Sequence, residues 1–324
     1  MSTRRTALRG LAAGAATLLA GRTLAQDQGA ITILVGAASS MDAVARIIAD
    51  QLREALGRPA IVLSKLGAGQ RVALGECKRA APDGRTLVFA TSGPFSVYPH
   101  IYNKLDYDPV ADFTPIAGIS YFDVAIATGP ATGAADLKQL VEWQRGRKSG
   151  DAVFGSAPGN GSLSHFVGIS TALATNVKMT HVPYKDSGVG IVDLAAGRLP
   201  MMITGLQPLI EMHKAGKIKI MAVSGDVRSP LVPDVPTLRE AGVNVTSSTF
   251  TGVFGPAKMP PDIVKRLQDV IAPMFSNAAI REKLAQQAMT PWPASQQQLA
   301  TLLADERKRF EQLVKATGYV REDA

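Results

Sequence analysis

Ile31-Thr32-Ile33-Leu34-Val35 is a short run rich in β-branched residues, which is typical of a strand that is buried on both faces. Apolar residues then recur at helical spacing over residues 41–56, and Gly57 and Pro59 end the predicted helix. Residues 60–63 form the next apolar run. The order strand, helix, strand predicts a parallel sheet with helices on its faces.

The same alternation continues along the chain. A helix over residues 72–80 and a strand over 86–90 follow, and residues 94–118, rich in Pro and aromatic residues, are expected to be irregular. A second series then contains helices over 135–145, 162–174, 187–196 and 206–214, and strands over 152–154, 179–182, 199–203 and 218–223. Helices over 261–276, 278–286 and 295–317 close the chain.

Two extended segments, 116–128 and 246–254, are long enough to pass between two halves of the molecule. We therefore expect an α/β fold with two mixed-sheet lobes joined by two crossover segments. Lobe 1 comprises residues 26–122 and 250–324, and lobe 2 comprises residues 123–249. A ligand cleft is expected between the lobes, where the carboxyl ends of parallel strands meet.

Residues 1–25 have the pattern of an export signal. A basic start is followed by an apolar stretch and by small residues before a cleavage site near Ala25. The pair Arg4-Arg5 favours a twin-arginine signal, and a general secretory signal is the alternative. Arg22 leaves the apolar run shorter than the roughly 20 residues of a membrane span. The expected location is the periplasm.

The net charge of the whole chain overstates that of the exported protein. The formal charge is +8, but residues 1–25 contain four arginines and no acidic residue, so their removal leaves +4. The remaining chain has no Lys/Arg run with interleaved aromatic residues, so we expect no nucleic-acid partner. The single cysteine, Cys77, cannot form an internal disulfide and is expected to be a small, partly buried side chain.

Three polar loops that follow predicted strands could hold a ligand. In the first, over residues 36–42, Ser39 and Asp42 have the spacing of a capping box, so a helix begins there with free backbone N–H groups. Such a helix start favours an anion, although an ordinary cap explains the residues equally well. The second loop, 91–93, offers two hydroxyl groups, and the third, 155–165, offers glycines and serines beside a helix start.

Two helix starts that face one cleft from opposite lobes would hold a carboxylate from both sides. Catalysis has little support, because the sequence shows no Gly-x-Ser-x-Gly motif and no nucleophile–base pair near the cleft. The histidines have no metal-ligand spacing, so we expect neither a cofactor nor a bound metal. They are His100, His165, His181 and His213.

Six motifs occur in a fixed order over residues 80–256, within a resemblance to a known family that extends over about residues 30–320. They are Ala80-Ala81-Pro82-Asp83-Gly84-x-Thr86-Leu87, Leu105-x-Tyr107-Asp108-Pro109-x-x-Asp112-Phe113, Gly159-Asn160-Gly161-Ser162-x-Ser164-His165, His181-Val182-Pro183-Tyr184-Lys185, Asp234-Val235-Pro236-Thr237-x-x-Glu240-Ala241-Gly242 and Gly252-x-Phe254-x-Pro256. Together they resemble the Bug, or TctC-like, receptors of tripartite tricarboxylate transporters.

The resemblance implies a type II periplasmic binding fold that closes on its ligand. It implies a di- or tricarboxylate, an acidic amino acid or an aromatic carboxylate as ligand, held partly through water. It also implies delivery to a membrane permease with one large and one small subunit. We expect a monomeric, non-catalytic transport receptor. The alternatives are a sensor that contacts a signalling kinase, and a hydrolase or isomerase, which would need a nucleophile–base pair.

The resemblance also assigns ligand contacts by position. These are Ala37, Ala38, Ser39, Ser40 and Met41 in the first loop, Thr91, Ser92 and Gly93 in the second, and Ser156, Asn160, Gly161, Ser162, Ser164 and His165 in the third. Tyr184 is either a contact or part of the cleft rim, and Phe250 either walls an apolar ligand or packs in the core.

The chain departs from the family pattern at two places. The first loop lacks the usual proline and glycines, so its side chains narrow the approach of a ligand to the backbone. Thr204 stands where members often have an aspartate that accepts a hydrogen bond from the ammonium group of an amino acid. We therefore predict a carboxylate ligand without a cationic amine.

Overall fold

The computed structural model describes residues 29–37, 40–148, 150–317 and 319–323. The predicted export signal lies outside the described residues, as do Ala38 and Ser39 of the first loop. Within the described ranges, none of the helices combines the length and the apolar character that a membrane crossing requires.

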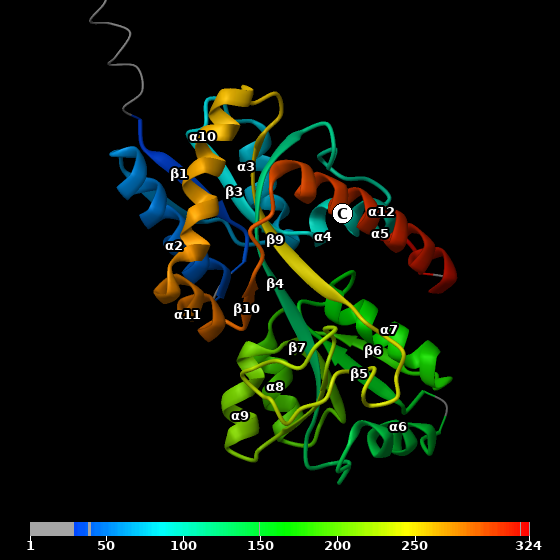
Figure 1. Cartoon of the computed structure of the whole chain (residues 1–324). Coiled ribbons are helices and arrows are strands. Elements are labelled where there is room, and N and C mark those ends of the chain that lie inside the picture. Colours follow the sequence, from blue (N-terminus) through cyan, green and yellow to red (C-terminus); the bar gives the residue numbers. More distant parts are fainter. Residues whose placement is uncertain (1–28, 38–39, 149, 318, 324) are drawn as a thin grey trace, which may run out of the picture.

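The N-terminal half of the sheet is parallel. Strands β1 (Ile31–Val35), β2 (Ala60–Ser64) and β3 (Thr86–Thr91) lie in the order β2-β1-β3, as their alternation with helices predicts. Helix α2 (Ser40–Leu56) buries its apolar stripe on one face of these strands, together with helices α10 (Pro261–Ile271) and α11 (Ala278–Gln286) (Figure 1). Helix α3 (Arg71–Lys78) contributes to the core on the other face.

Two long strands join this half to the rest of the molecule. Strand β4 (Phe113–Thr128) and strand β9 (Ser248–Pro256) pair antiparallel, and β9 also pairs with β3. The partners of β4 change along its length. Phe113–Asp123 pairs with β9, whereas the residues from Val124 to Thr128 pair with β7 (Met201–Gly205) and, from Ala125, also with β8 (Lys219–Val223). Among the described residues one sheet of ten strands results, and β4 crosses from one part of it to the other (Figure 1).

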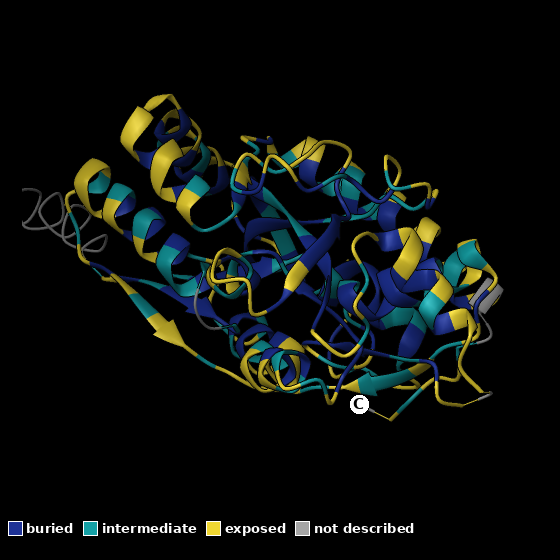
Figure 2. Cartoon of the chain, turned by 90° about the horizontal axis from the view of Figure 1, so that it is seen from below, coloured by how far each residue is buried: buried dark blue, intermediate teal, exposed yellow. Residues whose placement is uncertain are grey.

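The second part of the sheet has its own helices and core. Its strands are β5 (Val153–Ser156), β6 (Thr180–Pro183), β7 (Met201–Gly205) and β8 (Lys219–Val223). Its helices are α6 (Leu137–Arg145), α7 (Leu163–Thr175), α8 (Ser187–Ala195), η2 (Gln207–Leu209) and α9 (Ile210–Lys214). Separate apolar clusters lie on the two faces of these strands. Figure 2 shows that the central strands are mostly buried, whereas the helices have exposed outer faces.

Besides the unpredicted turn η1 (Ala68–Gln70) and the division of the helix predicted over 206–214 into η2 and α9, the structure differs from the expected elements in three places. Residues 94–118 are less irregular than predicted, since they contain the short helices α4 (Gly93–Ser96) and α5 (Tyr98–Ile101) and the start of β4. Each short helix has a proline in its first turn, a position where the missing N–H has no helical partner. The predicted helix over 261–276 is α10 (Pro261–Ile271) followed by the 3₁₀ helix η3 (Ala272–Ser276).

The third difference is a short strand that the sequence did not predict. Strand β10 (Met289–Pro291) follows helix α11 (Ala278–Gln286) and pairs with β4 around Tyr121. Helix α12 (Gln296–Thr317) then ends the chain's regular structure. A cluster of Ile101, Phe166 and Phe310 joins α5 and α12 to α7, so the two parts of the sheet also meet through side chains.

Candidate functional site

The first two predicted loops lie side by side. Strands β1 and β3 are neighbours, with Val35 opposite Phe89, so the segments that follow them leave the same edge of the sheet. Ser40 begins α2, and Met41 is 5% exposed and packs in the core. Only the half-buried Ala37 and Ser40 therefore remain as candidate contacts among the described residues of the first loop.

Both carboxylate oxygens of Asp42 accept hydrogen bonds from other side chains. Ser64 Oγ donates to Asp42 Oδ1 and Arg46 Nε donates to Asp42 Oδ2, both at 2.8 Å. Although its slight burial opposes the effect, these two contacts hold the pKa of the Asp42 carboxyl below its usual value. The aspartate thus ties the start of α2 to β2, while Ser39 lies outside the described residues.

Gln70 is a functional candidate that sequence reasoning missed. The Thr91 backbone N–H donates to Gln70 Oε1 at 3.1 Å, and Gln70 Nε2 donates to Thr91 Oγ1 at 2.6 Å. Gln70 belongs to the short 3₁₀ turn η1 (Ala68–Gln70). Gln70 and Thr91 are 21 residues apart in the chain. The contact depends on the packing of η1 beside β3, and no local pattern indicates it.

Ser92 uses its hydroxyl group inside the protein. Its Oγ lies 3.1 Å from Thr249 Oγ1, and the residue is 2% exposed. The Ser96 hydroxyl in α4 donates to Glu306 Oε2 at 2.9 Å. Burial raises the pKa of Glu306 despite this hydrogen bond. These contacts join α4 and the residue before it to β9 and α12. Gly93, the first residue of α4, has no side chain that would block a ligand from the backbone.

The third loop is held by its own serines. Ser162 caps α7 by accepting from the His165 N–H at 3.1 Å, and it donates to the Gly159 carbonyl at 2.8 Å. Ser164 Oγ donates to the Ala157 carbonyl at 3.0 Å and is buried. Asn160 is the exposed member of the set, so its side-chain amide is available to a ligand.

Two histidines support this loop from below. The Gly161 N–H donates to His165 Nδ1 at 3.1 Å, and Ser156 Oγ is hydrogen-bonded to His181 Nε2 at 2.7 Å. Burial lowers the pKa of His165 to about 3 and that of His181 to about 4. Both rings are therefore neutral at pH 7. They hold the loop by hydrogen bonds and supply no positive charge.

The Ser156–His181 pair has the atoms of a nucleophile and a base, which the sequence did not reveal because 25 residues separate them. However, Ser156 has no exposed surface, so an external substrate cannot reach its Oγ in this structure. The Ser156 hydroxyl also lies 3.3 Å from the Gly159 carbonyl. Both contacts fix the turn after β5.

Three further predicted residues have partners within the protein. The Tyr184 hydroxyl donates to Asp193 Oδ2 at 2.8 Å, and its burial, followed by this carboxylate, raises the pKa of Tyr184 to about 12. Thr204 is 1% exposed, with Oγ1 2.6 Å from Ser187 Oγ. Phe250 is 1% exposed and packs against Trp292, so core packing accounts for its side chain here.

Asp123 is a second polar residue that sequence reasoning missed. It lies where β4 changes partners, and Ser248 Oγ donates to its Oδ1 at 2.6 Å. Burial, and then the charge of Asp226, raises the pKa of the Asp123 carboxyl, while the Ser248 contact lowers it. A lone carboxylate within the apolar run of β4 was the available sequence signal. The arrangement ties both long strands together at the crossover.

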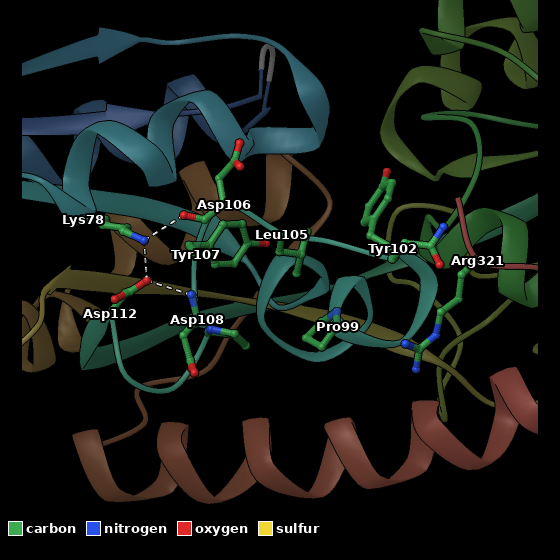
Figure 3. Close-up of a pocket in the computed structure, with 11 residues that line it drawn as sticks. Lys78, Pro99, Tyr102, Leu105, Asp106, Tyr107, Asp108, Asp112 and Arg321 are labelled. Atoms are coloured by element: carbon green, nitrogen blue, oxygen red, sulfur yellow. Dashed lines mark hydrogen bonds and ion pairs between the residues drawn. The ribbon is translucent and has the colours of Figure 1, made fainter. Parts of the chain in front are cut away.

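A surface cavity of about 470 Å³ lies elsewhere, around the Leu105–Phe113 motif. Figure 3 shows Lys78 between the Asp106 carbonyl and the Asp112 carboxylate, which it contacts at 2.7 and 2.8 Å. These bonds fix the segment before β4. A second cavity, of about 360 Å³, lies beside Gln268. Neither cavity is lined by a predicted site residue, and the described residues include no cluster of three or more metal-ligating side chains.

Comparison with known proteins identifies the family. The profile of the tripartite tricarboxylate transporter family receptor, TctC, matches residues 44–319. A UPF0065 protein of Bordetella bronchiseptica is 30% identical over 288 residues, which are 89% of this chain and 85% of that protein.

Two solved structures of relatives contain carboxylates. Rpa4515 of Rhodopseudomonas palustris with adipate has a TM-score of 0.84 at 26% identity, covering 92% of this chain and all of that one. MatC of the same organism with bound malate has a TM-score of 0.78 at 28% identity, covering 89% of this chain and 99% of that one. The expected periplasmic binding fold and the resemblance carried by the six motifs are both confirmed. This chain belongs to the TctC family of tripartite tricarboxylate transporter receptors.

Proposed function

We propose that this protein is a periplasmic receptor that binds a small carboxylate without a cationic amine and delivers it to a tripartite transporter permease. The observation that carries the proposal is the likeness, over about nine tenths of the chain, to two structures named for bound adipate and malate. Both are aliphatic dicarboxylates. The same class of ligand is therefore the first to test.

The proposed cleft lies between lobe 1, residues 26–122 and 250–324, and lobe 2, residues 123–249. The change in the partners of β4 after Asp123 supports this division, since the strand leaves one part of the sheet and enters the other there. The separate apolar clusters support it further. Two strands that cross together provide a hinge about which the lobes can move.

The proposed ligand contacts are neutral hydrogen-bond donors. In lobe 1 these are the first turn of α2 and the hydroxyl of Thr91, and in lobe 2 the first turn of α7 and the amide of Asn160. Oriented N–H groups at a helix start stabilise an anion without a formal positive charge. Because the Gly161 N–H is engaged by His165, it is not among these donors.

The absence of an aspartate at position 204 supports the choice of ligand. Thr204 Oγ1 lies against Ser187 Oγ, and a hydroxyl group offers an ammonium ion a weaker acceptor than a carboxylate does. We propose that the receptor is not an enzyme, which the complete burial of Ser156 supports.

The test is thermal denaturation of the purified exported protein with succinate, malate, adipate, citrate and benzoate. A ligand that binds only the folded state raises the melting temperature as its concentration rises. The bound acid is then recovered and identified by mass spectrometry. Stabilisation by at least one acid, recovered unchanged, is the expected result. No stabilisation by any of the five would overturn the ligand class, and conversion of the acid would overturn the non-catalytic role.

A further inference from the structure

Gln70 occupies an unusual backbone position beside the proposed site. Its φ of 76° is in the left-handed region, which non-glycine residues rarely adopt, and Ala68 two residues earlier has a φ of 46°. Such strained residues persist where the surrounding contacts fix them, and they concentrate at functional sites. The side chain of Gln70 is also 9% exposed, although an amide is polar. The η1 turn therefore directs the polar side chain of Gln70 inward, and the positive φ of its backbone costs conformational energy.

The two hydrogen bonds of Gln70 determine how its amide is oriented. The Thr91 backbone N–H can only donate, so the carbonyl oxygen Oε1 must face it, at 3.1 Å. The amide nitrogen Nε2 then faces Thr91 Oγ1 at 2.6 Å and donates to it. Since the hydroxyl oxygen accepts from Gln70, the proton of this hydroxyl is left to donate to another group. Thr91 is half-buried, so its hydroxyl can meet a ligand.

Gln70 also touches the other ligand loop of lobe 1. A Cβ atom on Gly36 would lie 2.5 Å from Gln70 Cα, closer than atoms can approach, so the two backbones are in direct contact. Gly36 is the first residue after β1, and Thr91 is the last residue of β3. One residue thus sets the separation of two segments that the proposed function assigns to the ligand.

We propose that Gln70 is a positioning residue for the bound carboxylate: it fixes Gly36, at the end of β1, relative to Thr91 and directs the Thr91 hydroxyl proton to the ligand. The proposal rests on the proposed function. Gln70 itself does not touch the carboxylate. Its effect on affinity is exerted through Thr91, and so the two residues should act as one unit.

Isothermal titration calorimetry with adipate and malate tests the proposal on the whole exported chain. Gln70→Met keeps the size of the side chain and removes both hydrogen bonds, and Thr91→Val keeps the shape of threonine and removes the hydroxyl. Each variant should raise Kd about tenfold, the effect of one hydrogen bond to a charged group. The double variant should bind no more weakly than either single variant, because each change breaks the same arrangement. Thr91→Ser, which keeps the hydroxyl, should stay within about twofold of the wild type.

Gln70→Gly separates positioning from folding. Gln70→Ala removes the same two hydrogen bonds but keeps the strained φ, whereas glycine adopts a positive φ without strain. Gln70→Gly should therefore unfold at the higher temperature of the two variants, while both bind the carboxylate equally weakly. Wild-type Kd values for Gln70→Met, Gln70→Gly and Thr91→Val would overturn the inference and leave the proposed function standing. Multiplicative losses in the double variant would also overturn it. If no carboxylate binds to the wild type, the proposed function fails, and the role of Gln70 fails with it.

Discussion

The imidazole rings of His165 and His181 are stacked, with centroids 3.8 Å apart and planes inclined by 18°. The two residues come from α7 and β6, and each ring holds a different part of the loop after β5. Burial is the largest cause of both lowered pKa values, and for His165 the charge of a protonated His181 lowers the pKa further. Protonation of either ring therefore destabilises the folded state of this loop.

This stack should make stability depend on pH. A histidine whose folded pKa is lowered stabilises the protein fully above its unfolded value near 6.5, and this contribution is lost as the pH falls towards the folded value. Between pH 6.5 and 4, His165 should remove up to about 1.4 kcal/mol of unfolding free energy per pH unit, and the partly exposed His181 less. Urea denaturation across this range measures the slope.

His165→Asn is the matched variant for this measurement. Its Oδ1 can still accept from the Gly161 N–H, but it does not titrate. The raised pKa values of Asp123 and Glu306 affect both proteins alike, so they cancel in the difference. The variant should lose less stability than the wild type on acidification. If the unfolding free energies of the two proteins fall in parallel with pH, protonation of the stacked pair does not destabilise the folded protein.

Glu306 should tolerate loss of its charge but not of its side chain. The residue is 6% exposed, and its Oε2 accepts from Ser96. Glu306→Gln keeps an oxygen for Ser96 and removes a buried charge, so it should lie within about 1 kcal/mol of the wild type at pH 7. Glu306→Ala leaves a cavity and an unpaired hydroxyl, and should lose roughly 2–4 kcal/mol. Equal losses in both variants, measured by urea denaturation, would contradict this account.

The two Glu306 variants also predict a pH dependence. Because burial raises the pKa of Glu306, the penalty for its charge is absent below the unfolded value and grows as the pH rises through the folded value. The stability of Glu306→Gln relative to the wild type should therefore increase from pH 4 to pH 8. A constant difference would mean that the carboxyl is not perturbed in the folded protein.

Tyr319 should help to hold the two lobes together. Its ring lies 5.7 Å from that of His165 and 6.0 Å from that of Phe166, between centroids, and so it packs on α7. Two backbone hydrogen bonds of 2.8 Å tie Glu322 to Ile101 and Asn103, at the end of α5. Tyr319→Ala should increase the radius of gyration in small-angle X-ray scattering. It should also weaken carboxylate binding several-fold, since a more open molecule binds less well.

Tyr319→Phe is the control, because it keeps the ring and removes only the hydroxyl that donates to Glu322. Its radius of gyration and its affinity for the carboxylate should equal those of the wild type. An unchanged radius for Tyr319→Ala, or equal effects of the two variants, would exclude the ring as the contact between lobes.

The Thr204→Asp substitution should shift the ligand preference of the receptor from simple dicarboxylates towards acidic amino acids. The new carboxylate would accept from the ammonium group of aspartate, and it can also accept from Ser187 in place of Thr204 Oγ1. Calorimetry should show the ratio of aspartate to succinate affinity rise by about tenfold or more. Some stability should be lost, because position 204 is 1% exposed and the charge is buried there. Thr204→Asn, which has the same shape without the charge, should leave the ratio unchanged.

Much of the fold follows from local patterns in the sequence. The apolar run over 31–35 and the helical spacing over 41–56 each predict one element within a residue or two, since burial on a sheet or a helix face imposes the period. The short helices that contain Pro94 and Pro99 in their first turns were missed, because proline and aromatic residues suit loops as well as helix starts. Strand β10 was also missed, because it has three residues and is defined by its pairing with β4 rather than by a local pattern.

The candidate site was predictable only in part. The positions of its three loops follow from strand ends and from the family motifs. The contacts within them do not, because the partners are far apart in the chain: Gln70 meets Thr91 and Ser92 meets Thr249 through tertiary packing alone. For the same reason, the sequence could not show that Ser92, Thr204 and Tyr184 direct their hydroxyl groups to partners within the protein.

The central claim is that the cleft binds a carboxylate and does not need an ammonium group. Calorimetric titration of the wild-type protein with succinate and malate, and with aspartate and glutamate under the same conditions, tests it most directly. A simple dicarboxylate should bind more tightly than the amino acid of the same carbon chain. Tighter binding of aspartate than of succinate would contradict it.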